Sequence, residues 1–218
     1  FNLEAAGFSS DKYEITPIIK PVIMGYSVEV DYPSYTNFSD VTLENINNLS
    51  VPQGTSLKWV FKTKNTTEIK FLEEGGQIKL NELSKNLYRT KKTIKNNSSF
   101  VLNVANDFML DKDSIVFNIS TSKDQNPTIF ANSKKDSLNE NLLYFNGKIS
   151  DDYGFSKFHF KYRKYLNDST GNRGKFTSVS VGFNDSYNQS QFYHVWDVEE
   201  VNLKLGESLE YFFEVWDN

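Results

Sequence analysis

Apolar and polar residues alternate along much of this chain. Tyr26, Val28, Val30 and Tyr32 fall on one side of an extended backbone, and the residues between them are polar. Successive side chains of a β-strand point to opposite sides, so this period of two is the pattern of a strand with one buried face. The segment is therefore predicted to be a strand that packs one side on a core.

The same alternation recurs in segments that extend to the end of the chain. Their apolar positions are Leu57, Trp59 and Phe61; Ile69 and Phe71; Phe100, Leu102 and Val104; Ile115, Phe117 and Ile119; Phe158, Phe160 and Tyr162; Val179, Val181 and Phe183; and Leu209, Tyr211, Phe213 and Val215. Helical spacing competes only in residues 80–87 and 137–143. Turn residues separate the strands at about the 8–12 residue spacing typical of sandwiches. The pattern predicts an all-β fold of tandem immunoglobulin-like antiparallel β-sandwiches, with Trp59 as a core residue.

A short motif occurs three times, in residues 1–7, 100–106 and 211–217. After the first two copies the chain continues alike, with a Phe and an Asp-Lys pair, a second strand and then Pro21 or Pro127. We interpret the motif as part of the hairpin that ends each module, with the proline opening the next. Chance similarity between alternating strands is the alternative explanation.

The repeat predicts the domain organisation. Residues 1–20 are expected to be the terminal hairpin of a preceding module, in which residues 1–6 pair with residues 13–19. Residues 21–125 form a complete module, and residues 126–218 form a second one that lacks its last strand. The joint is expected near residues 123–127, and we expect residues beyond Asn218 to supply the missing strand.

Composition narrows the range of functions. The length of 218 residues accommodates about two modules of roughly 100 residues each. Lys and Arg number 24 against 28 Asp and Glu, and a net charge of −4 gives no basic footprint for nucleic acid. The absence of cysteine excludes disulfides, thiolate zinc sites and a thiol nucleophile. No apolar stretch approaches the ~20 residues of a membrane helix, so any membrane attachment is expected through segments outside this chain.

Motifs of catalysis are missing from the sequence. It contains no Gly-x-Ser-x-Gly elbow, no Walker loop and no dinucleotide fingerprint. His159 and His194 have no metal-ligand spacing, and both are expected at surface strand positions. We predict no catalytic residue and no enzyme activity, although carboxylates that converge in the fold would be compatible with glycoside hydrolysis.

Carboxylates at strand ends are the candidates for a metal. Asp151 and Asp152 begin one strand and Asp217 ends another, where oxygen ligands from neighbouring loops can gather around Ca²⁺. The alternative is that residues 151–154 form a turn in which carboxylates accept hydrogen bonds from backbone amides. Calcium is the only cofactor that the sequence brings into consideration.

Candidate glycosylation sites are numerous. Asn-x-Ser/Thr occurs at Asn37, Asn48, Asn65, Asn96, Asn97, Asn118, Asn167, Asn184 and Asn188. In a chain so rich in Asn and Ser, several such tripeptides arise by chance. Ser137 and Ser169 each follow an aspartate in an Asp-Ser/Thr context, which makes them candidates for glycosylation on serine, and plain solvated loops are the alternative. Exposed rings at Tyr162, Tyr165, Tyr187 and Tyr193 are candidates for stacking on sugars.

Four segments carry a resemblance to a known family. They are residues 32–36, 51–59, 149–155 and 211–218. They resemble a family of large membrane-anchored Bacteroidota proteins that is known only as a domain of unknown function. The resemblance implies tandem immunoglobulin-like modules in the cell envelope, facing the periplasm, and it brings no catalytic residues.

The expected function is mechanical and organisational. Modules of this kind would space or dock components of a large membrane-anchored envelope protein, with neighbouring modules and other envelope proteins as partners. A carbohydrate-binding or adhesive module is the alternative, and an enzyme with a site assembled from loops is a third.

Overall fold

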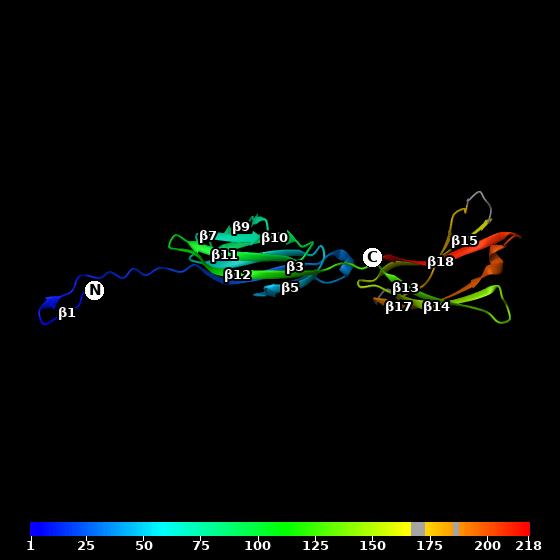
Figure 1. The fold of residues 1–218 in the computed structure, drawn as a ribbon, viewed down its shortest axis with the longest axis horizontal. Helices are drawn as coiled ribbons and strands as arrows, with labels where there is room; N and C mark the ends of the chain where they lie inside the picture. The colour runs from blue at the N-terminus through cyan, green and yellow to red at the C-terminus, as the bar shows by residue number, and fades with distance from the viewer. Residues whose placement is uncertain (167–172, 185–187) are drawn as a thin grey trace. The chain divides into compact units, whose positions relative to one another are not determined.

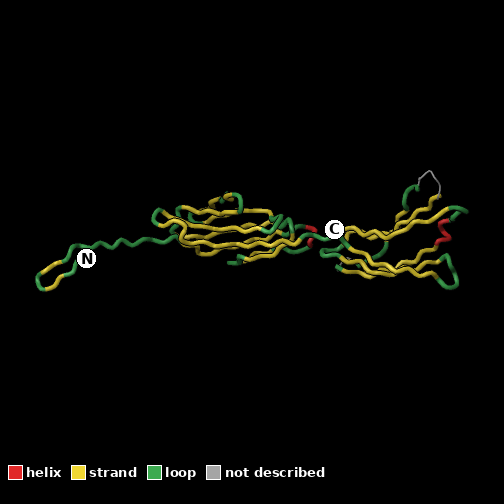
Figure 2. Tube along the Cα trace, viewed as in Figure 1, coloured by secondary structure: helices red, strands yellow, loops and turns green. Residues whose placement is uncertain are grey.

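The chain folds into two units (Figures 1 and 2). The computed structural model describes residues 1–166, 173–184 and 188–218, with residues 111 and 112 described by their backbone alone. Unit 1 comprises Phe1–Pro33 and Ser39–Ser122, and unit 2 comprises Ser34–Phe38 and Lys123–Asn218. The boundary after Ser122 lies beside the joint expected near residues 123–127.

Unit 1 is a sandwich of two sheets. The first has the order β4 (Val41–Glu44), β3 (Val22–Asp31), β6 (Ser56–Lys64), β10 (Leu87–Thr93) and β9 (Asn81–Ser84), and its strand pairs are antiparallel. The second has the order β5 (Asn48–Pro52), β12 (Met109–Ser122), β11 (Ser98–Asn106), β7 (Glu68–Glu73) and β8 (Gly76–Ile78). In this second sheet β5 runs parallel to β12.

Aromatic side chains from both sheets fill the core of unit 1. Trp59, Phe61, Phe71, Phe100 and Phe117 are all 0% exposed. The Trp59 ring lies 5.2 Å from that of Phe71 and 5.3 Å from that of Phe100, distances at which tilted rings attract each other. The alternation predicted these strands and their buried faces correctly, and Trp59 is confirmed as a core residue.

Unit 2 also has two sheets. One has the order β13 (Thr128–Lys135), β14 (Leu142–Ser150) and β17 (Gln189–Asp197), and the other has the order β16 (Thr177–Ser180), β15 (Phe155–Leu166) and β18 (Glu207–Asp217). The core between them contains Phe145, Phe158, Phe160, Phe192 and Trp196. The two sheets of this unit lie face to face in Figure 1.

The strand order is that of an immunoglobulin-like sandwich. In unit 1, β3-β6-β10-β9 correspond to strands A, B, E and D, and β12-β11-β7-β8 correspond to G, F, C and C′. In unit 2, β13-β14-β17 correspond to A, B and E, and β18-β15-β16 correspond to F, C and C′. The chain is therefore an all-β protein of tandem immunoglobulin-like antiparallel β-sandwiches, as predicted.

The N-terminal hairpin is shorter than expected. Strand β1 (Glu4–Ala5) pairs with β2 (Phe8–Ser9) in a two-stranded sheet of its own. Positive φ at Ala6 and Gly7 makes a tight turn, which brings the second arm back at once. The Tyr13 amide still donates to the Phe1 carbonyl at 2.7 Å, but residues 14–19 form no strand, so that part of the predicted pairing is wrong.

The two segments with competing helical spacing are not α-helical. Residues 81–84 are β9, and residues 137–141 are a loop that leads into β14 at Leu142. The helical elements in the described ranges are the 3₁₀ turns η1 (Ser34–Thr36) and η2 (Val198–Val201). Neither has the length and hydropathy that a membrane-spanning helix needs.

Candidate functional site

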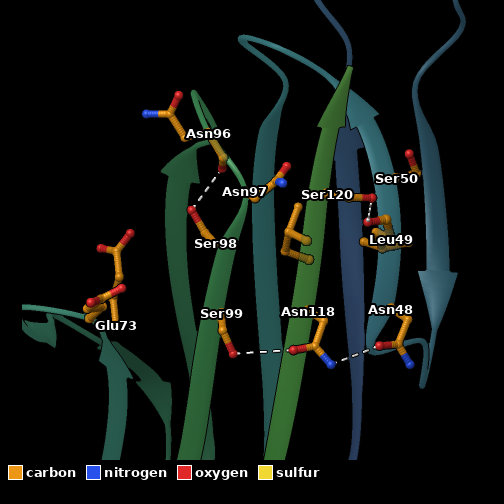
Figure 3. Close-up of a pocket in the computed structure, with 12 residues that line it drawn as sticks. Asn48, Leu49, Ser50, Glu73, Asn96, Asn97, Ser98, Ser99, Asn118 and Ser120 are labelled. Atoms are coloured by element: carbon orange, nitrogen blue, oxygen red, sulfur yellow. Dashed lines mark hydrogen bonds between the residues drawn. The ribbon is translucent and has the colours of Figure 1, made fainter. Parts of the chain in front are cut away.

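A polar groove lies along one sheet of unit 1. It has a volume of about 940 Å³ and runs over β5, β12 and the start of β11 (Figure 3). Amide and hydroxyl side chains dominate its lining, which includes Asn48, Ser50, Asn96, Asn97, Ser98, Ser99, Asn118 and Ser120. Glu73 and Glu74 provide its carboxylates. Such a lining offers many hydrogen-bonding groups to a ligand.

Hydrogen bonds between side chains cross three strands in this groove. Asn118 Nδ2 donates to Asn48 Oδ1 at 3.0 Å, and Ser99 Oγ donates to Asn118 Oδ1 at 3.3 Å (Figure 3). The ladder joins β5, β12 and β11 side by side. An N-linked glycan on Asn118 would replace a hydrogen of the amide that bonds Asn48, so glycosylation there would disturb this ladder.

The calcium candidates all lie in unit 2. Asp151 Oδ2 accepts hydrogen bonds from the amides of Tyr153 and Gly154, both at 2.9 Å. Asp152 Oδ1 accepts from the Gln125 amide at 3.4 Å, and Asp217 Oδ1 accepts from the Asn218 amide at 3.0 Å. The first pair of contacts is the turn geometry that was the alternative to a metal site.

The three carboxylates nevertheless share a neighbourhood. Burial raises the pKa of Asp124, and the negative charges of Asp217, Asp152 and Asp151 raise it further. Asp151 Oδ1 is buried without a hydrogen-bond partner. Across the described ranges, no three acidic or histidine side chains are grouped closely enough to hold a metal ion. Calcium binding here remains a prediction.

One of the two serine candidates for glycosylation lies in an exposed loop. Ser137 is exposed in the loop between β13 and β14, where Asp136 Oδ1 accepts from the amides of Leu138 at 2.8 Å and Asn139 at 3.0 Å. Modification of Ser137 would meet no steric obstacle in the core. Ser169 lies outside the described residues.

The tyrosine candidates differ in how far their rings are exposed. Tyr162 packs against the core of unit 2, with its ring 5.1 Å from that of Trp196. The Arg173 guanidinium lies over the Tyr165 ring at 5.0 Å from its centroid. Tyr193 is 63% exposed, and Tyr187 lies outside the described residues. Of the described candidates, Tyr193 is the one most available to a ligand.

A second ring, which the sequence interpretation did not single out, accompanies Tyr193. Tyr144 on β14 lies 6.3 Å from Tyr193 between ring centroids, at an interplanar angle of 29°. The two rings line a cleft of about 350 Å³ together with Lys134, Phe145 and Asn146. Tyr144 lies between Leu143 and Phe145, which both face inward. This alternation in the sequence could have indicated that Tyr144 faces outward.

His194 lies on the inner face of its strand, so the surface position expected for it is wrong. Its ring packs 4.7 Å from Phe160, and its Nε2 atom is buried without a hydrogen-bond partner. Burial lowers the pKa of His194. Side chains along a strand point alternately to opposite faces, so His194 faces inward with Phe192 and Trp196.

These features define a class of protein, the tandem immunoglobulin-like β-sandwich with a polar groove and an exposed aromatic cleft. No protein-family model matches the sequence, and no curated protein matches it either. Among solved structures, the chain is similar to a chimeric titin tandem functionalised with an exogenous fibronectin peptide. That match has 11% identity and a TM-score of 0.32, over 88% of this chain and 96% of the other.

A second similar structure is β-glucuronidase 3 of Bacteroides uniformis without ligand. The identity is 10% and the TM-score 0.28, over 88% of this chain and 25% of the enzyme. At these TM-scores neither likeness carries an inference about this chain. The fold class follows from its own sheets and their strand order.

Proposed function

We propose that the chain is a non-catalytic structural and interaction region of a larger membrane-anchored cell-envelope protein, facing the periplasm. In this role it spaces or docks components of the envelope, and its partners are neighbouring modules and other envelope proteins. The repetition of one strand plan in two successive units supports this role, because tandem sandwiches are a common way to build extended regions.

The docking role is supported mainly by a free sheet edge in unit 2. Strand β11 of unit 1 is paired on both sides, with β7 and β12. Its counterpart β18 pairs with β15, and the described residues of unit 2 contain no counterpart of β12. A row of backbone amides and carbonyls on β18 is therefore open for pairing.

Burial of the core differs accordingly between the two strands. Phe100 and Leu102 on β11 are 0% exposed. On β18 the corresponding Tyr211 is 40% exposed, and Phe213 is only partly buried. Unit 2 thus leaves uncovered a part of its core that β12 covers in unit 1.

Strand addition is the docking mode that fits such an edge. An extended segment that pairs with β18 would satisfy its backbone groups and place alternate apolar side chains on the core. We infer that a segment of the larger protein outside residues 1–218 supplies this strand, in the position that β12 occupies in unit 1.

A chimaera tests this inference with sequence from the chain itself. Residues 107–122, which contain β12, are appended after Asn218 through a short flexible linker. The control carries the same residues in scrambled order. We expect the β12 extension to raise the melting temperature of unit 2 and to reduce self-association in light scattering. Equal behaviour of the extended, scrambled and original chains would show that the β18 edge needs no further strand.

The cleft between Tyr144 and Tyr193 favours a second candidate function, a carbohydrate-binding or adhesive module. Sugar-binding sites commonly combine exposed aromatic faces with amide and hydroxyl groups, and this cleft has two phenol rings beside Asn146. A glycan array probed with the full chain tests it. Binding that is lost on replacement of Tyr193 would support this candidate, and a blank array would count against it.

A further inference from the structure

One outward face of unit 2 combines aromatic rings with positive charge. In the β13-β14-β17 sheet, Lys134 is opposite Tyr144, and Asn146 is opposite Tyr193. Opposite residues of an antiparallel pair share a face, so these four side chains lie on the side away from Phe145 and Trp196. Lys148 lies on the same face, two residues along β14 from Asn146.

The corresponding face of unit 1 has a different character. There Lys58 forms an ion pair with Glu29, and Lys91 forms one with Asp31 at 3.3 Å. The first pair joins the adjacent strands β6 and β3, and the second joins β10 to β3 across β6, so the charges on this face are neutralised locally. The outward face of this sheet therefore carries paired charges in unit 1. In unit 2 the corresponding face carries aromatic and amide side chains. The requirements of the sandwich do not account for this difference.

Charge within the cleft is of one sign. Lys134 lines it, and no carboxylate does. In the described part of the chain, neither Lys134 nor Lys148 lies within 4.0 Å of a carboxylate. The nearby Asp136 already has partners: its Oδ1 accepts from two backbone amides and its Oδ2 accepts from the hydroxyl of the cleft residue Tyr144 at 3.2 Å. These amide hydrogen bonds, and to a smaller extent the charge of Lys134, lower the pKa of Asp136, but the two side chains form no ion pair within 4.0 Å. An anion in the cleft would therefore meet an available ammonium group.

We propose that this cleft binds a hexuronic acid unit of an acidic glycan, an inference that rests on the carbohydrate-binding candidate and specifies its ligand. The apolar face of the sugar ring stacks on Tyr193, the more exposed of the two phenols. The Asn146 amide bonds ring hydroxyls, and the Lys134 ammonium pairs with the sugar carboxylate. Tyr144 is held in place by its hydrogen bond to Asp136.

A matched pair of hexasaccharides tests the proposal. Titration calorimetry compares β-1,4-linked oligomannuronate with β-1,4-linked mannohexaose on the full chain, because the two differ mainly in the carboxylate. We expect the acidic oligosaccharide to bind at least about tenfold more tightly, which is what one charge-assisted hydrogen bond supplies. High salt should reduce this preference.

Three variants localise the site. Tyr193→Ala should abolish binding of both oligosaccharides, and Lys134→Gln should lower the affinity for the acidic one to that for the neutral one. Arg89→Ala, on the corresponding face of unit 1, is the control and should change neither. Circular dichroism establishes that each variant is folded, and both cleft side chains that are replaced are exposed.

Each outcome bears on a different step of the proposal. Equal affinity for both oligosaccharides would overturn the acidic ligand while leaving a carbohydrate site. Binding that survives Tyr193→Ala would overturn the cleft as the site. No binding of either would overturn the hexuronic acid proposal, and the glycan array would decide the carbohydrate candidate separately. The result with the appended β12 strand would still decide the docking role of β18 independently.

Discussion

The His194 ring packs against the Phe160 ring at a centroid distance of 4.7 Å and an interplanar angle of 44°. Phe145 and Phe213 lie against the same imidazole. The ring is thus a neutral member of an aromatic cluster, and its protonation would place a charge among apolar groups. This relationship makes unit 2 sensitive to pH.

The stability of unit 2 should fall as the pH is lowered below about 6.5, the usual pKa of histidine. Burial lowers the pKa of His194 in the folded state. As the pH falls, the unfolded state therefore binds the proton first, and this binding stabilises the unfolded state relative to the folded one. Above that pH the effect is absent. Urea unfolding between pH 8 and 5 measures it, with His194→Phe expected to flatten this dependence. His159→Asn, on the outer face of β15, should retain it, and parallel curves for all three proteins would contradict the assignment.

Trp59→Ala should destabilise unit 1 by about 3–5 kcal/mol, because a large side chain is removed from a site that is 0% exposed. Unit 2 has its own core, so its unfolding should be unchanged and two separate transitions should appear in calorimetry. Trp216→Ala provides the exposed control, since Trp216 is 52% exposed. A shift of both transitions by Trp59→Ala would mean that the two cores unfold together.

Asp151→Ala should cost unit 2 about 1–2 kcal/mol through the loss of its bonds to the amides of Tyr153 and Gly154. The turn geometry predicts the same loss in calcium and in EDTA. Thermal melts under both conditions check this, with Glu140→Ala, at an exposed position of the same unit, as the control. If chelation lowers the melting temperature of the wild type and Asp151→Ala abolishes that response, calcium is bound there.

Gly147→Ala should destabilise unit 2 by about 1–3 kcal/mol, the usual range for overpacking. A Cβ at position 147 would lie 2.1 Å from the Phe130 carbonyl oxygen and 2.8 Å from the Phe192 ring, so β13 would have to move. Gly182→Ala is the matched control, because a Cβ there meets no atom within 4 Å. Chemical denaturation of the two variants compares the costs, and equal stability would place β13 differently.

Sequence patterns predicted the long strands because those strands have one fully buried face. Tyr26, Val28 and Val30 alternate with polar residues over most of β3, and all three are buried. The edge strands β4 and β9 have four residues each, most of them exposed, and are too short for periodicity to identify them. The parallel pairing of β5 with β12 joins residues distant in sequence, which local periodicity does not encode.

The candidate sites were predictable to a smaller extent. The sequence placed Asp151 in a turn or a metal site, and the hydrogen bonds show the turn. It named Tyr193 but not Tyr144, because the contact depends on the antiparallel register of two strands that lie far apart along the chain. His194 was placed on the wrong face, since its neighbours Tyr193 and Val195 are also apolar and obscure the alternation.

The β5–β12 pairing also determines the order in which unit 1 becomes complete during synthesis. Asn48 and its partner Asn118 are separated by 70 positions. Strand β5 therefore stays unpaired during synthesis until β12 has left the ribosome. Until then β11 lacks one neighbour, as β18 does among the described residues of unit 2. Each nascent unit would thus pass through a stage with an adhesive edge, and a slow ribosome at that point would lengthen its exposure to other chains.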